Sequence, residues 1–226
     1  MIVEKTPQNY KLSEKVGEVP LDLILRNVLS RAVILMLKDQ FCDYEDINVL
    51  TPVRSQAMTL IQRISQLAKK GPIQEDIQLL ISNLPQLLVV CEHDWQAKHS
   101  FFMIMKGLIL EKTLKPQIYQ MFGKDMLIQS ILRVEDSVKI VVTEILSLFL
   151  DKYFEEKDPY HFIDQILVNL AETLKLTDDI EGSVIYVFNL INQILSLEKF
   201  DPKKSKFRIE SSVFFPFNFH RVLKVR

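Results

Sequence analysis

Apolar residues recur every three or four positions along most of the chain, which is the spacing that lines one face of an α-helix. The run of Leu23, Ile24, Val28, Ala32 and Leu35 is one example. Alternating apolar and polar stretches, which are typical of strands, are missing, as are the glycine turns that join strands. The pattern therefore predicts a protein built from α-helices.

Prolines punctuate this helical pattern at a regular interval. Pro20, Pro72, Pro116, Pro159 and Pro202 each precede a new apolar run. Proline has no backbone N–H, and the N–H groups in the first turn of a helix make no hydrogen bond within the helix, so proline fits there. The last four are about 43 or 44 residues apart, within the interval of about 40–47 residues that is typical of HEAT and armadillo repeats. The spacing predicts a stack of repeated units.

Each interval contains a helix, a short acidic turn and a second helix. We expect the first helices over residues 21–41, 72–90, 116–132 and 160–176, and the second helices over 50–68, 95–112, 137–154 and 183–200. The stretch 138–150 is apolar on more than one face, so it must be buried on several sides, which a stack allows and a lone helix pair does not.

The predicted fold is all-α, a HEAT-type α-solenoid of about four helix pairs plus a partial fifth. Residues 1–20 are expected to form an N-terminal extension, 21–210 the repeats, and 211–226 the start of a further, truncated repeat. The last assignment rests on Phe214, Phe215, Phe217 and Phe219, which would have no second helix to cover them.

Composition narrows the classes of protein that the chain can represent. Of 226 residues, 48% are hydrophobic and 25% charged, which argues against disorder. The 28 basic and 29 acidic residues give no basic excess of the kind that nucleic-acid binders carry. Two cysteines cannot build a disulfide framework, and no stretch reads as a signal peptide or a membrane span. We expect a soluble, intracellular protein.

Candidate chemistry is sparse. Five scattered glycines leave no phosphate-binding loop. Cys91, His93, Asp94 and His99 cluster around one turn, but their spacing matches no zinc pattern, so a structural turn is the preferred interpretation. No residues are arranged as a nucleophile with its base. We predict no catalytic residue, no metal and no cofactor.

A basic segment near the C-terminus has two interpretations. Its cations are Lys203, Lys204, Lys206 and Arg208. They could contact phosphate groups of a nucleic acid. A charged loop between repeats explains them as well, and we prefer that interpretation.

Acidic residues occupy the same place in successive repeats. They are Asp43, Glu45, Asp46, Glu92, Asp94, Glu135, Asp136, Asp178, Asp179 and Glu181. One carboxylate per turn would stabilise the N-terminal end of the next helix by about 0.3–1 kcal/mol, but capping does not need two or three. Stacking would line the turns along one edge and leave a more basic opposite edge, with Lys69, Lys70, Lys112, Lys115, Lys199, Lys203 and Lys204. We predict that the acidic residues bind a basic protein partner.

Two segments carry specific motifs. The first has Phe41, Asp43, Tyr44, Val49, Pro52, Val53 and Arg54, and the second has Trp95, Lys98, His99 and, further on, Lys106. Both resemble the helical-repeat region of the TATA-binding-protein-associated, Swi/Snf-related ATPases (the modifier-of-transcription family). Thr51 replaces an alanine of the family pattern, and Ser100 and Phe101 replace small glycines, so helix packing there is expected to differ. Weaker likeness continues over residues 133–146 and 174–180, and altogether covers about 21–226.

The resemblance implies a function. It suggests a non-enzymatic, nuclear arm that binds the TATA-binding protein, within a remodeller whose separate ATPase motor removes that protein from promoters. Promoter DNA would be contacted only through the complex, and neither a membrane nor a small-molecule substrate is implied. Pro52, Arg54, Trp95 and His99 match the motif and are interpreted as fold-determining, with Trp95 and Arg54 packing and pairing between repeats.

Two alternatives remain open. A HEAT-repeat adaptor of another complex, such as a transport or assembly scaffold, would have the same architecture. An enzyme with an all-α core and an unrecognised site would instead show a pocket with convergent polar groups and coupled, shifted titrations.

Overall fold

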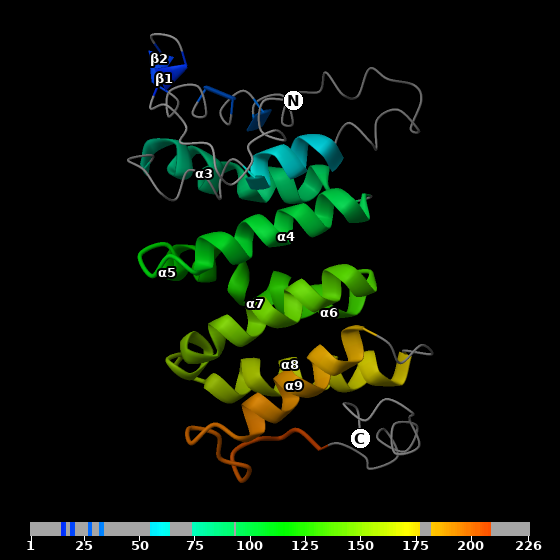
Figure 1. The fold of residues 1–226 in the computed structure, drawn as a ribbon. Coiled ribbons are helices and arrows are strands. Elements are labelled where there is room, and N and C mark those ends of the chain that lie inside the picture. The colour runs from blue at the N-terminus through cyan, green and yellow to red at the C-terminus, as the bar shows by residue number, and fades with distance from the viewer. Residues whose placement is uncertain are drawn as a thin grey trace. The chain divides into compact units, whose positions relative to one another are not determined.

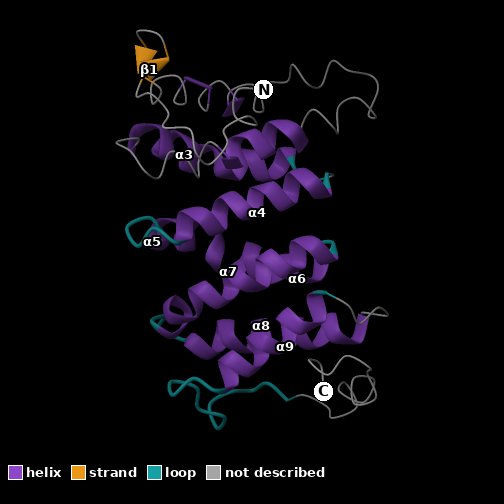
Figure 2. Ribbon diagram, viewed as in Figure 1, coloured by secondary structure: helices purple, strands orange, loops and turns teal. Residues whose placement is uncertain are grey.

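A computed structural model describes residues 15–16, 19–20, 27–28, 32–33, 55–63, 74–92, 94–176 and 182–208. The described residues are mostly helical, which confirms the prediction of an all-α protein (Figure 2). The chain divides into two compact units, Met1–Val90 and Cys91–Arg226. Each unit is described by itself.

The first unit contains one long described helix and a short ladder. Strands β1 (Lys15–Val16) and β2 (Val19–Pro20) pair antiparallel within the predicted N-terminal extension. Residues 55–63 are helical, as predicted. Helix α3 (Gln74–Val90) lies within the predicted range 72–90 and buries a stripe of leucines and isoleucine, Leu80, Ile81, Leu84 and Leu87.

The second unit follows the predicted helix pairs closely. Its elements are α4 (Trp95–Ile109), α5 (Lys115–Ile118), the π-helical turn η2 (Tyr119–Gly123), α6 (Asp125–Arg133), α7 (Asp136–Phe154), α8 (Pro159–Leu176) and α9 (Ser183–Leu195). Helix α8 begins at its proline, as expected. The predicted first helix over 116–132 is divided by η2, and the predicted helix over 183–200 ends at Leu195.

The helices of the second unit pack in two rows (Figure 1). Helix α7 packs against α4 on one side and α9 on the other, and these three form the second-helix row. Helices α6 and α8 pack together as the first-helix row. Helix α7 also contacts α6 and α8, and α8 contacts α9. Helix α7 therefore has neighbours on several sides, as its many apolar positions required.

An aromatic cluster fills the core between α4, η2 and α7. The ring of Tyr119 meets those of Phe149 and Tyr153 edge to face, at centroid distances of 5.2 and 5.3 Å. Phe101 of α4 is fully buried and lies edge-on to Phe122 of η2 at 6.0 Å. Phe101 stands where the family that the sequence resembles tends to have glycine, so a large side chain fills the space there.

Polar contacts between helices join residues about one repeat interval apart. Lys106 of α4 donates to Glu144 of α7 at 2.8 Å, a separation of 38 residues. Asn169 of α8 donates to the carbonyl of Ile128 in α6 at 2.8 Å, across 41 residues. Within the described part of this unit, the side-chain hydrogen bonds that cross between elements span 30 to 47 residues. Each helix is thus linked to its neighbours in the rows.

After α9 the chain runs without a helix through residues 196–208, here called the C-terminal strap (Figure 2). Both carboxylate oxygens of Asp164 in α8 hold it: Oδ1 accepts from the Ser205 hydroxyl at 2.6 Å and Oδ2 from the Lys206 N–H at 2.7 Å. The basic segment 203–208 is therefore a loop, as its preferred interpretation predicted, and these bonds hold it against α8. Residues 211–226, the predicted fifth repeat, lie outside the described residues.

Candidate functional site

The acidic turns are described in part. Four of the acidic residues belong to the second unit: Glu92 and Asp94 precede α4, Glu135 precedes α7, and Asp136 is the first residue of α7. The remaining acids of the predicted binding surface lie outside the described residues; they are Asp43, Glu45, Asp46, Asp178, Asp179 and Glu181.

Asp94 is a helix cap. Its Oδ1 accepts the backbone N–H groups of Gln96 at 2.9 Å and Ala97 at 3.1 Å, which satisfies two of the free donors at the start of α4. The residue is only 4% exposed. Asp94 therefore cannot form part of an exposed binding surface. The prediction that it binds a partner is wrong, because its side chain is buried as a cap.

Glu92, Glu135 and Asp136 are exposed. Asp136, at the first turn of α7, accepts from Lys139 at 3.1 Å and from the hydroxyl of Ser183 at 3.3 Å. Because Ser183 is the first residue of α9, this bond brings the N-terminal ends of α7 and α9 together. The N-terminal ends of α4, α7 and α9 lie on the same side of the second unit (Figure 1), and we call this side, with Glu92, Glu135 and Asp136, the turn edge.

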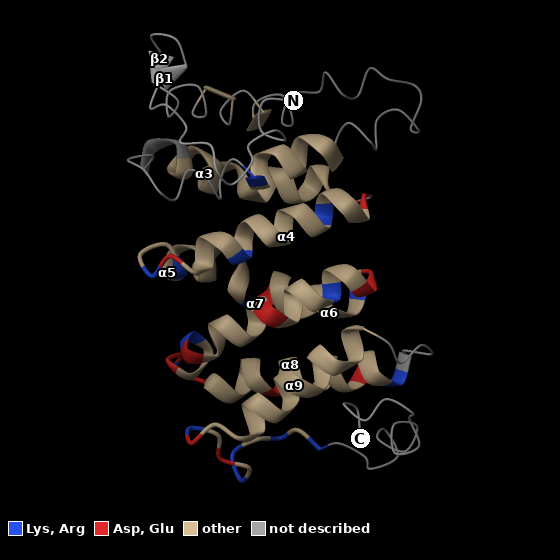
Figure 3. Ribbon diagram, in the orientation of Figure 1, with Lys and Arg blue, Asp and Glu red and all other residues tan. Residues whose placement is uncertain are grey.

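The charges at the two edges are mixed (Figure 3). At the ends of α6 and α8, Arg133 and Lys175 accompany the acids. At the opposite ends of the helices, lysines pair with carboxylates: Lys115 with Asp151 at 2.6 Å, Lys124 with Glu156 at 3.1 Å and Lys152 with Glu155 at 2.7 Å. Of the lysines predicted for a basic opposite edge, Lys115 is paired with an acid, and Lys69 and Lys70 lie outside the described residues, so the basic edge stays a prediction.

The second resemblance segment, from Trp95 to Lys106, lies in α4. Trp95 is 49% exposed, and its packing between repeats stays a prediction, because the preceding helix belongs to the first unit. His99 is half-buried, and burial lowers its pKa, which favours the neutral ring. Lys106 links α4 to α7 through Glu144. Residues 41–54, the first resemblance segment, lie outside the described residues.

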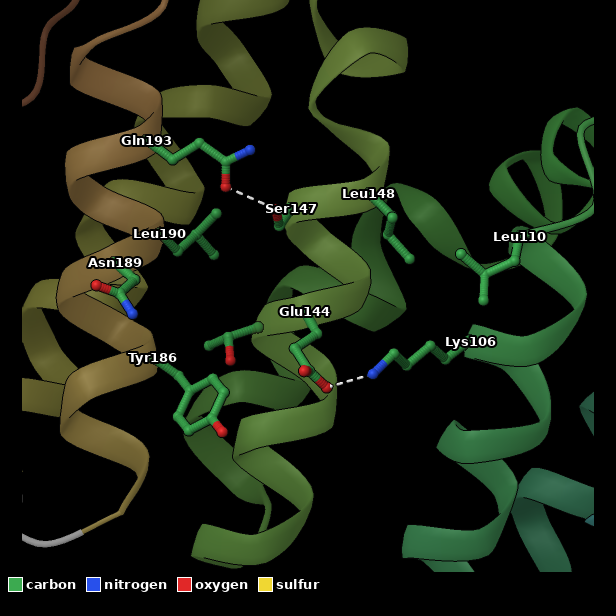
Figure 4. A pocket seen from close by; sticks show the side chains of 10 residues that line it. Lys106, Leu110, Glu144, Ser147, Leu148, Tyr186, Asn189, Leu190 and Gln193 are labelled. Carbon is green, nitrogen blue, oxygen red and sulfur yellow. Dashed lines mark hydrogen bonds and ion pairs between the residues drawn. The ribbon is translucent and has the colours of Figure 1, made fainter.

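An open groove lies over α7 on the second-helix row (Figure 4). This α7 groove measures about 290 Å³. Its lining comes from α4, the residue that follows it, α7 and α9: Lys106, Leu110, Thr143, Glu144, Ser147, Leu148, Tyr186, Asn189, Leu190 and Gln193. The Lys106–Glu144 ion pair crosses it on one side, and the Ser147 hydroxyl donates to Gln193 Oε1 at 2.6 Å on the other.

The α7 groove was not foreseen from the sequence. One signal was present: the stretch 183–195 contains no charged residue, yet Tyr186, Asn189 and Gln193 recur at three and four positions. Such a stripe lies on one face of a helix and gives it polar groups without charge. The sequence does not show which helices lie beside this face, because that depends on how the helices stack.

The candidate metal ligands do not form a site in the described residues. Cys91 is buried, Asp94 caps α4, and His93 lies outside the described residues. Across the described ranges, no three His, Cys, Asp or Glu side chains are grouped closely enough to hold a metal ion. Among the same residues, no helix has the length and apolar character needed to cross a bilayer.

The chain was also compared with known proteins. No family model, no curated protein and no solved structure matches it.

Proposed function

We propose that this chain is a HEAT-type α-solenoid scaffold that binds another protein and carries out no chemistry itself. The observation that carries the proposal is the pair of helix rows in the second unit. Polar contacts between elements join residues 30 to 47 positions apart, close to the proline interval. In repeat proteins each unit contacts only its neighbours, and the exposed faces of the stack bind partners.

Titrating groups support a non-enzymatic role. Among the described residues, tyrosines have the most strongly raised pKa values, and burial is the first cause for both Tyr119 and Tyr153. Both rings belong to the aromatic core and not to the α7 groove. Catalytic sites shift pKa values where substrate can reach the group, so these shifts reflect packing.

The partner we propose is the TATA-binding protein. This proposal rests on the resemblance of the Trp95, Lys98, His99 and Lys106 pattern, and of residues 41–54, to the modifier-of-transcription ATPases. The chain would be the helical-repeat arm of a nuclear remodeller that removes the TATA-binding protein from promoter DNA. A HEAT-repeat adaptor of another complex is the alternative.

Exposed groups at the turn edge suit such a partner. Trp95 exposes about half of its surface beside the turn that contains Glu92. Glu135 is exposed at the start of α7. An aromatic side chain among carboxylates can anchor on a basic protein surface, since tryptophan often dominates binding energy and acids steer the encounter.

The test is the affinity of the purified chain for purified TATA-binding protein across a salt series. Reversing Glu92 and Glu135 to lysine should weaken binding by about tenfold at low salt and flatten its salt dependence. A second variant that reverses Asp178, Asp179 and Glu181 examines the turn before α9 in the same way.

The matched control reverses two exposed acids at the opposite ends of the helices, Glu111 and Glu198. It changes the net charge by the same amount and should leave affinity nearly unchanged. Equal losses in both variants would remove the turn edge from the proposal. A wild-type chain that does not bind the TATA-binding protein would favour the alternative adaptor.

A further inference from the structure

We infer that the α7 groove binds an uncharged, extended segment of a partner protein, through backbone hydrogen bonds and small apolar contacts. The inference rests on the proposed scaffold function and not on the identity of the partner. The groove is separate from the acidic turns, because it lies along the middle of the second-helix row (Figure 4).

Charge is the first argument for the occupant. Two of the residues that line the α7 groove are charged, Lys106 and Glu144, and they pair at 2.8 Å. Their side chains are 28% and 35% exposed, so the pair is partly desolvated. The α9 side contributes no charge, since the stretch 183–195 has none. A charged segment would have no opposite charge left to pair with and would lose hydration, whereas an uncharged segment complements the lining.

The amide groups along α9 are the second argument. Asn189 and Gln193 are exposed and four residues apart, which places them about 6 Å apart along the helix axis. Peptide groups that face the same side of an extended chain repeat every two residues, or about 6.6–6.8 Å. The two side chains can therefore meet successive peptide groups of a strand that follows α9.

An existing hydrogen bond prepares one of these amides. The Ser147 hydroxyl donates to Gln193 Oε1 at 2.6 Å, which holds the oxygen and turns the amide NH₂ outward as a donor. Figure 4 shows this pair beside Leu190 and above Asn189. A helical segment could not use these amides in the same way, because its own peptide groups are already bonded within the helix.

Apolar side chains at the rim supply the third argument. Leu110 is 60% exposed and Tyr186 is 37% exposed. Leu148 also lines the groove, on the α7 side. In an extended segment, side chains that alternate with the bonded peptide groups would reach these residues.

The experiment is selection of a phage-displayed library of random linear peptides on the immobilised full chain. We expect enrichment of uncharged peptides in which apolar residues alternate. Affinities of the enriched peptides, measured by calorimetry, should fall at least tenfold in the variant that carries both Asn189→Ala and Gln193→Ala. The matched control, Gln129→Ala with Gln165→Ala, removes two exposed amides from the first-helix row and should change nothing.

Several outcomes would overturn the inference. They are no enriched peptide, enrichment of charged peptides, enrichment of peptides with helical apolar spacing, and equal losses in both double variants. Self-association of the wild type that disappears in the Asn189/Gln193 variant would assign the groove to a second copy of the chain. No TATA-binding protein is used, so peptide binding without binding of that protein would support the groove and remove only the partner assignment.

Discussion

The hydroxyl of Tyr119 lies between a buried aromatic cluster and a carboxylate. Its ring packs on Phe149 and Tyr153, and its hydroxyl donates to Glu156 at 3.1 Å. Burial is the largest cause that raises the pKa of Tyr119, and the charge of Glu156 adds to it. Burial likewise raises the pKa of Tyr153, whose hydroxyl donates to the carbonyl of Gly123. The neutral phenols are thus part of the packing.

This cluster predicts a loss of stability in alkali. In the unfolded chain a tyrosine ionises near pH 10, whereas folded Tyr119 and Tyr153 keep their protons to higher pH. Above about pH 10 the unfolded state therefore binds fewer protons than the folded state, and the free energy of unfolding falls as pH rises. Urea denaturation between pH 8 and 11 should show this slope, and it should be shallower in Tyr119→Phe and in Tyr153→Phe. Parallel slopes in all three proteins would contradict the assignment.

At the scale of elements, the π-helical turn η2 adapts one helical stretch to the core. Residues 116–132 were predicted as one helix, but η2 inserts a wider turn that brings Tyr119 and Phe122 into the core. Gly123 makes this close packing feasible. A Cβ atom on it would overlap Cδ2 of Tyr119 and lie 2.8 Å from Cε2.

Gly123→Ala should therefore destabilise the protein. The Tyr119 ring cannot move aside, since Phe149 and Tyr153 hold it. Overpacking of this kind costs about 1–3 kcal/mol, measurable as a lower urea midpoint with an unchanged m-value. Gln120→Ala, an exposed change in the same turn, is the control and should be within about 0.5 kcal/mol of wild type. Equal stability of the two variants would show that the ring can relax.

The sequence pattern located the described helices well. Predicted limits at 137–154 and 160–176 differ by one residue at one end from α7 and α8. The reason is that apolar spacing, acidic turns and helix-opening prolines all indicate the same boundaries. The π turn could not be predicted, because only the packing of Tyr119 against Gly123 favours it over a regular helix. Similarly, α9 ends at Leu195 because the strap is drawn to Asp164, a contact between distant residues.

The candidate site was less predictable than the fold. An acidic residue before a helix can cap it or face a partner, and sequence does not separate these roles. Asp94 is buried as a cap, whereas Glu135 is exposed at the equivalent place. Trp95 shows the same difficulty, since its exposure depends on neighbouring repeats. The α7 groove arises from three helices that lie far apart in the sequence, so its lining follows only from their packing.

At the scale of the whole second unit, the rows imply that a local defect destabilises mainly the helices in contact with it. A closed bundle would spread a local defect over all its helices, but a stack should confine it. Ile194→Val in α9 should cost about 0.5–1.5 kcal/mol and raise amide hydrogen exchange more in α8 and α9 than in α4. Ile104→Val in α4 should give the reverse pattern; both isoleucines are buried. A uniform rise across residues 94–208 in either variant would contradict the stacked arrangement.

The clamp at Asp164 also has a mechanical consequence. It fixes Ser205 and Lys206, near the end of the described residues, to α8. A pulling force applied at Arg208 would act first on the hydrogen bonds of Asp164 and on α8. It would reach the helices that line the α7 groove only after those bonds break. The hydrogen bonds of a single aspartate would thus resist tension first, and the face that we expect to bind a partner would keep its shape.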